Sequence, residues 1–307
     1  MPRRVLVTGG SGFIGRHVVT SLGAAGHEVR VVDLRPYPDP AVDIVVGDLA
    51  RPDVVDASLD GGVDAVVHLA AVTSVLRSVE EPEAAYRTNV AATALLLERS
   101  RQAGVGVLVF ASTNAVIGPM TALAIVETAP LRPLTPYGAT KAAAEMLMSA
   151  YSAALGLRCA ALRFTNVYGL GMAEKDSIVA RLMRAALSGA TFEIYGDGSQ
   201  VRDYVNVTDV VAAIGLALSD ARWSGPTVIG SGRSVSVVDI VGSVRRITGT
   251  LLPTRNVAGQ PGEMPAVVVD NACARSRGWA PVVDLEAGIE AVWAEWSAAA
   301  TVGAGPP

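Results

Sequence analysis

Apolar residues form short continuous runs along the first 230 residues, and longer segments with helically spaced apolar residues separate these runs. Runs that are apolar throughout are typical of strands buried on both faces of a parallel sheet. They predict strands at 4–10, 28–34, 43–49, 64–71, 105–113, 159–169 and 227–232.

The segments between the runs have the Ala- and Leu-rich composition of helices, at 12–26, 81–104 and 137–156. Strands that alternate with helices of this length predict a doubly wound α/β fold of the Rossmann type, with a parallel sheet covered on both faces. After about residue 167 the elements become shorter and richer in Gly and Pro. We therefore expect a second, smaller lobe toward the C-terminus.

Composition narrows the class of protein. The chain has 307 residues, of which 50% are hydrophobic and 18% charged, so it can bury a large core. A formal net charge of −4 with scattered arginines predicts no binding to nucleic acid. No apolar run reaches the roughly 18 residues of a membrane-spanning helix, so we expect no membrane partner.

The sequence lacks the patterns of secreted and of metal-binding proteins. The N-terminal "MPRRVLVTGG" passes from two arginines directly into a strand, without the apolar core and cleavage site of a signal peptide. Cys159 and Cys273 lie far apart and the three histidines are scattered, which favours neither a disulfide framework nor a metal site. We expect a cytoplasmic protein that binds no metal.

Three glycines lie between the first predicted strand and the first predicted helix, in "VLVTGGSGFIGRHVV": Gly9, Gly12 and Gly15. A dinucleotide needs a tight turn there, a bare backbone against its pyrophosphate and a helix N-terminus facing the anion. A glycine triplet alone can also be a plain strand-to-helix turn. Asp33 adds context because it closes the second strand, where a carboxylate binds a ribose 2′-hydroxyl and repels a 2′-phosphate. The pattern predicts NAD, while Arg35 leaves NADP open.

The next two strands end at the same edge of the predicted sheet. Asp48 follows the third strand, where it either closes a turn or contacts the adenosine. The fourth strand ends in "HLAA" (68–71), whose small residues would let the backbone approach a cofactor. His68 itself is predicted to be a packed core residue.

Tyr137 and Lys141 are four residues apart on the predicted helix 137–156, and Lys141 is one of only two lysines in the chain. This spacing puts an ammonium near a phenol hydroxyl on one helix face. A free phenol has a pKa of about 10, so it becomes a useful base near neutrality only where a cation favours the phenolate. The pair therefore predicts acid–base chemistry.

Taken together, these motifs and several later ones resemble the extended short-chain dehydrogenase/reductase superfamily, and within it the NAD-dependent nucleotide-sugar epimerases and dehydratases of the UDP-glucose 4-epimerase type. The resemblance covers nearly the whole chain. It rests on "TGGSGFIG" (8–15), Asp33, "GDL" (47–49), "HLAA" (68–71), Asn89, "YGATK" (137–141), "RFTNVYG" (163–169), "IYGDGSQVRDYVNVTDV" (194–210) and "QPGEMPAVVVDNACARSRGWAP" (260–281).

The resemblance implies an NAD-dependent enzyme whose catalytic residues are Thr113, Tyr137 and Lys141. Thr113, at the end of the fifth strand, would hydrogen-bond the reacting hydroxyl, and Lys141 would also hold the nicotinamide ribose. The predicted NAD-binding residues are Gly9, Gly12, Phe13, Ile14, Gly15, Asp33, Asp48, Leu49, Leu69, Ala70, Ala71, Asn89, Tyr137 and Lys141.

The resemblance also implies a small-molecule nucleotide-sugar substrate, bound by Ser112, Thr113, Asn166, Arg202, Gln260 and Val267. Gln260 stands where relatives carry a second arginine for the diphosphate, so one charge-assisted contact is missing. Arg255 and Arg275 are nearby candidates to replace it. Val267 falls where relatives sense the bulk of the sugar.

Asn114 and Ala115 bear on the choice of reaction. In the dehydratases that the chain resembles, the corresponding residues supply the acid and base that eliminate water, and neither of these side chains can do so. A 4-epimerase needs only oxidation to a 4-keto sugar and return of the hydride to the other face. We therefore expect a UDP-sugar or related NDP-sugar 4-epimerase. The alternatives are an NDP-4-ketosugar reductase, a hydroxysteroid-type dehydrogenase and a non-catalytic dinucleotide sensor.

The expected domain plan is an NAD-binding domain and a substrate-binding lobe. The first would comprise residues 1–166 with a returning segment around 202–232, and the second 167–201 and 233–300. Residues 301–307 would be a frayed tail. The resemblance further implies a homodimer formed through helices 83–101 and 137–155.

Overall fold

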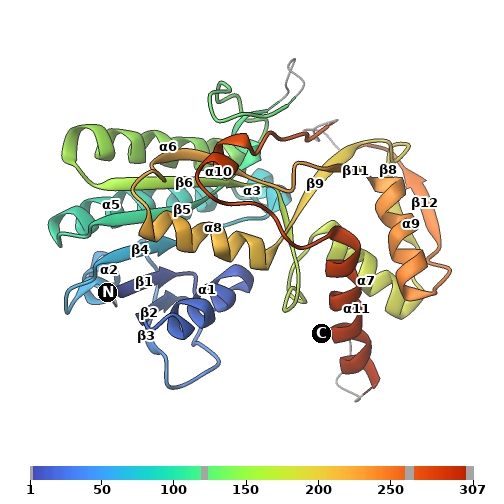
Figure 1. The fold of residues 1–307 in the computed structure, drawn as a ribbon, viewed down its shortest axis with the longest axis horizontal. Helices are drawn as coiled ribbons and strands as arrows, with labels where there is room; N and C mark the ends of the chain where they lie inside the picture. Colours follow the sequence, from blue (N-terminus) through green and yellow to red (C-terminus); the bar gives the residue numbers. More distant parts are fainter. Residues whose placement is uncertain (1–2, 119–123, 260–265, 302–307) are drawn as a thin grey trace.

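The computed structural model describes residues 3–118, 124–259 and 266–301. Seven strands form its central sheet: β1 (Arg4–Thr8), β2 (Glu28–Asp33), β3 (Asp43–Val46), β4 (Ala65–His68), β5 (Val107–Thr113), β6 (Arg158–Phe164) and β10 (Gly225–Ile229). All pair in parallel, in the order β10-β6-β5-β4-β1-β2-β3 (Figure 1). The strand order reverses between β1 and β4, which is where open α/β sheets bind ligands.

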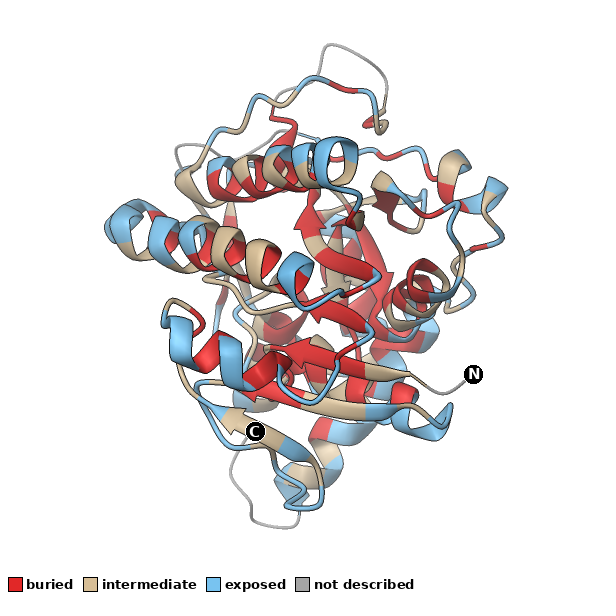
Figure 2. Ribbon diagram, turned by 90° about the vertical axis from the view of Figure 1, so that its left-hand side faces the viewer, coloured by how far each residue is buried: buried red, intermediate tan, exposed pale blue. Residues whose placement is uncertain are grey.

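Helices cover both faces of this sheet, as the alternation of patterns predicted. One face packs against α1 (Phe13–Ala24) and α8 (Val207–Ser219), and the other against α2 (Pro52–Leu59), α5 (Ala92–Gln102) and α6 (Pro136–Leu155). The strands are buried between these layers, and the outer helix faces are exposed (Figure 2). The predicted Rossmann-type α/β fold is confirmed.

A second lobe lies beyond the carboxyl ends of the strands, at the right of Figure 1. A three-stranded sheet joins β7 (Asn166–Tyr168), β9 (Val201–Asn206) and β11 (Ser234–Ser236), and a two-stranded sheet joins β8 (Phe192–Tyr195) and β12 (Thr254–Val257). Their apolar side chains share a core with α7 (Ile178–Ser188), α9 (Val237–Thr248) and α11 (Leu285–Thr301). The other short helices are α3 (Val75–Glu80), α4 (Pro82–Tyr86) and α10 (Ala272–Ser276).

Two predicted elements are interrupted in the structure. The predicted strand 159–169 is divided, because Thr165 and Asn166 hydrogen-bond Asp203 of β9 and draw the chain from the main sheet to the small one. The predicted helix 81–104 contains a π-helical segment, Arg87–Ala91, between α4 and α5.

The predicted tail, 301–307, is helical at its first residue. Thr301 is the last residue of α11, and the rest of the predicted tail, 302–307, lies outside the described residues.

Among the described residues, none of the helices has both the length and the apolar character that crossing a membrane requires.

Candidate active site

A cavity of about 1180 Å³ runs along the carboxyl ends of the strands and continues into the second lobe. Nearly all predicted site residues line it: Gly9, Gly12, Phe13, Ile14, Gly15, Asp33, Asp48, Leu49, Leu69, Ala70, Ala71, Ser112, Thr113, Tyr137, Lys141, Asn166, Arg202 and Val267. Asn89 does not line it, and Gln260 lies outside the described residues.

The glycine loop connects β1 to α1 at one end of the cavity. Gly9 has a positive φ of 70°, and a Cβ on it would lie 2.7 Å from the backbone nitrogen of Ala70. A Cβ on Gly15 would lie 2.2 Å from the carbonyl oxygen of Gly9. Only glycine fits at these two positions, so the loop is a close-packed backbone cradle at a helix N-terminus, which suits a pyrophosphate.

Asp33 closes β2 beside this loop and is held from two sides. Its Oδ2 accepts a hydrogen bond from the backbone N–H of Ser11 at 3.0 Å, and its Oδ1 accepts one from the N–H of Arg35 at 3.1 Å. The Arg35 guanidinium turns away to an ion pair with Glu174 at 2.8 Å, and Arg16 lies 3.5 Å from the same carboxylate. Arg35, which made NADP an alternative to NAD in the sequence analysis, is therefore already paired with a carboxylate.

The ends of β3 and β4 complete this half of the cavity. Asp48 closes a turn by accepting the N–H of Ala50 at 2.9 Å, and it also lines the cavity. At the end of β4, the backbone N–H groups of Leu69 and Ala70 donate to the Thr8 hydroxyl at 3.2 and 3.1 Å. Sequence reasoning missed the role of Thr8.

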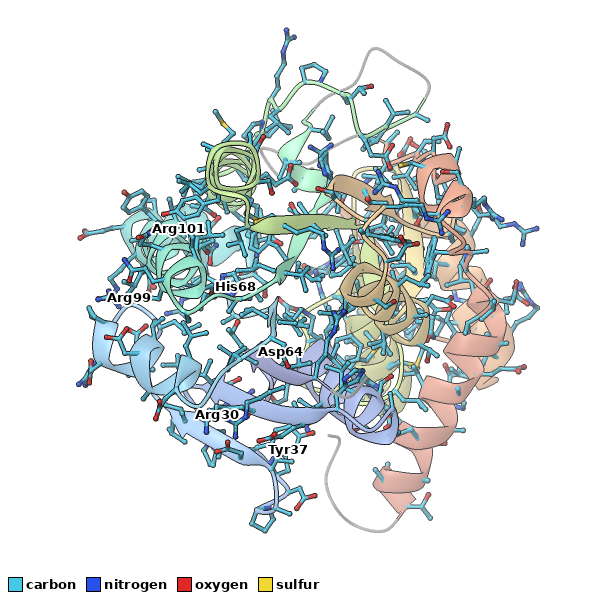
Figure 3. The ribbon with its side chains drawn as sticks, turned by 60° about the vertical axis from the view of Figure 1, so that its left-hand side comes forward. Arg30, Tyr37, Asp64, His68, Arg99 and Arg101 are labelled. Atoms are coloured by element: carbon cyan, nitrogen blue, oxygen red, sulfur yellow. The ribbon has the colours of Figure 1, made fainter. Side chains whose placement is uncertain are left out.

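His68 is a packed core residue, as the sequence predicted, and it lies in the interior of the molecule (Figure 3). Its ring nitrogens contact the hydroxyls of Thr8 at 2.7 Å and Thr93 at 2.8 Å. Burial, reinforced by the charge of Lys141, lowers the pKa of His68 to about 3, so its ring stays neutral. Because Thr93 donates to a carbonyl, the neutral ring donates to Thr93 and accepts from Thr8.

Asn89 supports the cavity wall from behind. Its side-chain amide accepts from the backbone N–H of Val72 at 2.8 Å, donates to the carbonyl of Val72 at 3.0 Å, and donates to the Thr140 hydroxyl at 3.0 Å. It is 1% exposed and lies in the π-helical segment. Asn89 thus holds the segment after β4 against α6.

Thr113, Tyr137 and Lys141 meet where β5 ends against the first turns of α6. The Tyr137 hydroxyl lies close enough to Thr113 for that side chain to favour the phenolate. The Lys141 ammonium donates to the carbonyl of Ala111 at 2.9 Å and lies 4.4 Å above the ring of Phe110. Pro136 and the Thr135 hydroxyl, which accepts from the N–H of Gly138 at 3.2 Å, set the helix start that orients the pair.

Burial controls the acid–base state of this pair. It raises the pKa of Tyr137 to about 12, and the nearby Thr113 side chain acts in the opposite direction. It lowers the pKa of Lys141 to about 7. The expected lowering of the phenol pKa by Lys141 is not seen, because burial dominates and the ammonium is turned to Ala111. Both groups are therefore sensitive to any charge that enters the cavity.

The residues predicted for the substrate extend into the second lobe. Asn166 donates to the carbonyl of Asp203 at 2.9 Å, and Arg202 lines the cavity beside it. Val267 is 3% exposed and belongs to the same wall. Arg255 is paired with Glu193, and neither Arg255 nor Arg275 is among the described residues that line the cavity.

Two cations on this wall were missed by sequence reasoning. Lys175 and Arg181 both line the cavity, and burial lowers the pKa of Lys175. The Arg181 guanidinium lies 5.7 Å from the ring of Phe192 and 5.8 Å from that of Tyr195. The only available signal was the rarity of lysine, since both lysines of the chain reach the cavity.

The chain is similar to known proteins over nearly its whole length. Residues 5–230 match the model of the NAD dependent epimerase/dehydratase family. A UDP-glucose 4-epimerase from Azospirillum brasilense is 34% identical over 311 residues, which are 93% of this chain and 89% of the relative.

Solved structures agree with these sequence matches. A UDP-glucose 4-epimerase of Thermus thermophilus, in complex with NAD, has a TM-score of 0.90 and 34% identity, with coverage of 95% of this chain and 98% of its own. MoeE5, solved with NAD and UDP-glucose, has a TM-score of 0.90 and 38% identity, with coverage of 97% and 99%.

Proposed function

Because the chain belongs to the NAD-dependent epimerase/dehydratase family, we propose that it is an NAD-dependent UDP-sugar 4-epimerase. The observation that carries this proposal is the meeting of Thr113, Tyr137 and Lys141 at the wall of a cavity that also holds the glycine loop. The names of the relatives and of the solved neighbours support the same activity.

The chain's own residues suit NAD. The backbone of Gly9 and Gly15 leaves no room for a Cβ, and Asp33 is held beside them as an acceptor for a ribose hydroxyl. Lys141 and Tyr137 would hold the nicotinamide end. Bound NAD would take up the hydride from carbon 4 of the sugar and return it, so one tightly held molecule would serve every cycle.

Tyr137 acts as the acid and base. It removes the proton of the sugar 4-hydroxyl and returns it after the keto sugar has turned over, while Thr113 hydrogen-bonds the same oxygen. Because burial raises the pKa of this phenol to about 12, it needs a positive charge nearby, which Lys141 supplies when protonated.

The substrate residues act on the nucleotide and the sugar. Arg202 binds the diphosphate, and Lys175 and Arg181 supply positive charge on the same wall. Asn166 and Ser112 are polar contacts at the boundary of the two halves, and Val267 limits the space beside the sugar.

Elimination of water is not part of this proposal. Asn114 and Ala115 lie in the turn after β5 and line the cavity, and neither side chain ionises. We therefore expect no 4-keto-6-deoxy sugar among the products.

The test is a screen of nucleotide sugars without added cofactor. Purified protein is incubated with UDP-glucose, UDP-glucuronic acid or UDP-N-acetylglucosamine, and the products are separated by chromatography and identified by NMR. We expect a 4-epimer and no accumulation of NADH. A reaction that consumes added NAD or NADH stoichiometrically would replace the epimerase by an oxidoreductase, and a 4-keto-6-deoxy product would replace it by a dehydratase.

The proposal also covers the roles of the two domains. Residues 1–166 and 202–232 bind NAD, and residues 167–201 with 233–300 bind the sugar nucleotide.

The proposal further covers the oligomeric state and the cellular location. The protein is a homodimer joined through residues 83–101 and 137–155, where Met146 is exposed on α6. Sedimentation equilibrium tests this oligomeric state. The protein works in the cytoplasm, which the two unpaired cysteines support.

A further inference from the structure

One face of α6 contacts three consecutive residues at the end of β5. The contacts come from side chains spaced by four residues along the helix: Tyr137, Lys141 and Glu145. Tyr137 lies beside Thr113, Lys141 donates a hydrogen bond to the Ala111 carbonyl, and Glu145 accepts a hydrogen bond from the Ser112 hydroxyl. Glu145, which makes the third contact, lies one helical turn beyond Tyr137 and Lys141 and has no role in the proposed mechanism.

Glu145 is fixed by a buried arginine. Arg163 of β6 donates from Nη2 to its Oε2 at 2.7 Å and from Nε to its Oε1 at 3.0 Å. The two side chains are 3% and 6% exposed, and the remaining Nη1 of Arg163 donates to the carbonyl of Glu127 at 2.9 Å. A carboxylate with these bonds has one available orientation, and in that orientation it holds Ser112.

We propose that Glu145 is a positioning residue of the proposed epimerase: held by Arg163, it fixes the end of β5, and with it Thr113, against the helix that carries Tyr137 and Lys141. The inference rests on the proposed function, because it assigns the carboxylate to the support of that catalytic set. A displaced Ser112 would carry its neighbour Thr113 with it.

The charges around Lys141 agree with this role. Burial lowers the pKa of Lys141 to about 7, and the Glu145 carboxylate raises it. From β4, His68 interacts with the amine as a neutral ring, and Tyr137, one turn earlier on the same helix, is a phenol whose pKa is about 12. At neutral pH the carboxylate is therefore the charge that favours a protonated Lys141.

The experiment uses a double variant that removes one negative and one positive charge from the interior, so the net buried charge stays the same. Glu145→Gln alone would leave Arg163 buried without its partner, so Glu145→Gln is combined with Arg163→Gln. Glu286→Gln, which removes the acidic member of the exposed pair with Arg246, is the matched control. For each protein, bound NAD, KM, kcat and the pH dependence of kcat are measured.

We expect the double variant to retain NAD and KM, while kcat falls by roughly 10- to 100-fold, because a displacement of about 1 Å can cost 10²-fold. The alkaline limb of its kcat profile should move to lower pH, because Lys141 loses its proton more readily without the carboxylate. Glu286→Gln should match the wild type. If kcat of the folded, NAD-loaded double variant and its pH profile equal those of the wild type, the proposal is wrong.

Ser112→Ala keeps the proposal testable if the double variant does not fold. A positioning role predicts a several-fold fall in kcat, whether or not KM also rises through the substrate contact proposed for Ser112, and an unchanged kcat would overturn it. A wild-type protein without epimerase activity would contradict the proposed function itself, so the two failures are distinguishable.

Discussion

The two halves of the cavity are lined by different kinds of chemical group. The half near β1 and β2 presents backbone: glycines without room for a Cβ, and a carboxylate already bonded to two N–H groups. The half in the second lobe presents long cationic side chains, Arg202, Lys175 and Arg181, carried by a small sheet, a loop and a helix. Recognition by close-packed backbone is all-or-none, whereas recognition by several charges is graded.

Tyr137 lies at the boundary of the two halves, and its loss should give the largest effect. Tyr137→Phe removes the proton-transfer group and keeps the ring, so kcat should fall by roughly 10²–10⁴-fold while NAD and substrate still bind. The control is Tyr151→Phe, which lies on the same helix as Tyr137 and removes a hydroxyl hydrogen-bonded to Glu98 of α5. A near-normal kcat would remove Tyr137 from the mechanism.

Graded recognition in the second lobe is tested at Arg202. Arg202→Ala should raise KM by roughly 10- to 100-fold with little change in kcat, because a hydrogen bond to a charged group contributes about 1.5–3 kcal/mol. Lys175→Met should raise KM less, and Arg222→Ala at the surface not at all. Steady-state kinetics with the substrate identified by the screen measure this, and an unchanged KM would remove Arg202 from the diphosphate site.

Substitutions in the cofactor half of the cavity should change the preference for NAD over NADP. Asp33→Ser removes the acceptor for the ribose hydroxyls and the repulsion of a 2′-phosphate, so the preference for NAD over NADP should shrink. Glu174→Gln releases Arg35 and should shift the preference the same way, by less than roughly fivefold, because exposed ion pairs contribute about 0–1 kcal/mol. Calorimetric titration with both dinucleotides is the measurement; equal wild-type affinity for NADP would contradict the assignment.

The smallest effect concerns stability and its pH dependence. The pKa of Lys141 is about 7 in the folded protein and 10.5 ordinarily, so between these values the unfolded chain binds a proton that the folded chain does not. Stability should therefore rise with pH across this window. Lys141→Met removes the burial penalty and should raise the urea midpoint of NAD-free protein at pH 7, with the gain fading toward pH 10. A gain independent of pH would contradict the lowered pKa.

The cofactor half could be predicted from the sequence because its chemistry is local. A glycine loop after a strand, and a carboxylate at the end of the next, occupy adjacent strand ends whenever the sheet is parallel. The pair Tyr137 and Lys141 was equally accessible, since a helix brings residues four apart together. Asn89 was associated with the cofactor by its motif, but its bonds are to Val72 and Thr140.

The remaining contacts depend on pairing between distant segments, which periodicity does not encode. Glu145 meets Arg163 across 18 residues, and Arg35 meets Glu174 across 139. The division of the predicted strand 159–169 likewise depends on Asp203, a buried carboxylate that only the folded chain brings near. Charged residues within apolar runs were the available signal, since an unpaired charge is costly to bury.

The π-helical segment Arg87–Ala91 has a consequence for how this chain can change over time. A π turn holds one residue more than an α turn, so it acts as a single-residue insertion within a continuous helix. Deleting one residue there would restore a regular α-helix and leave the residues beyond it facing nearly the same way, because the wider π turn absorbs the rotation of its extra residue. Leu96 and Leu97 would stay in the core, while Asn89 would lose its place opposite Val72 and Thr140. An ancestor or descendant without the insertion would therefore need a compensating change only at the contacts of Asn89.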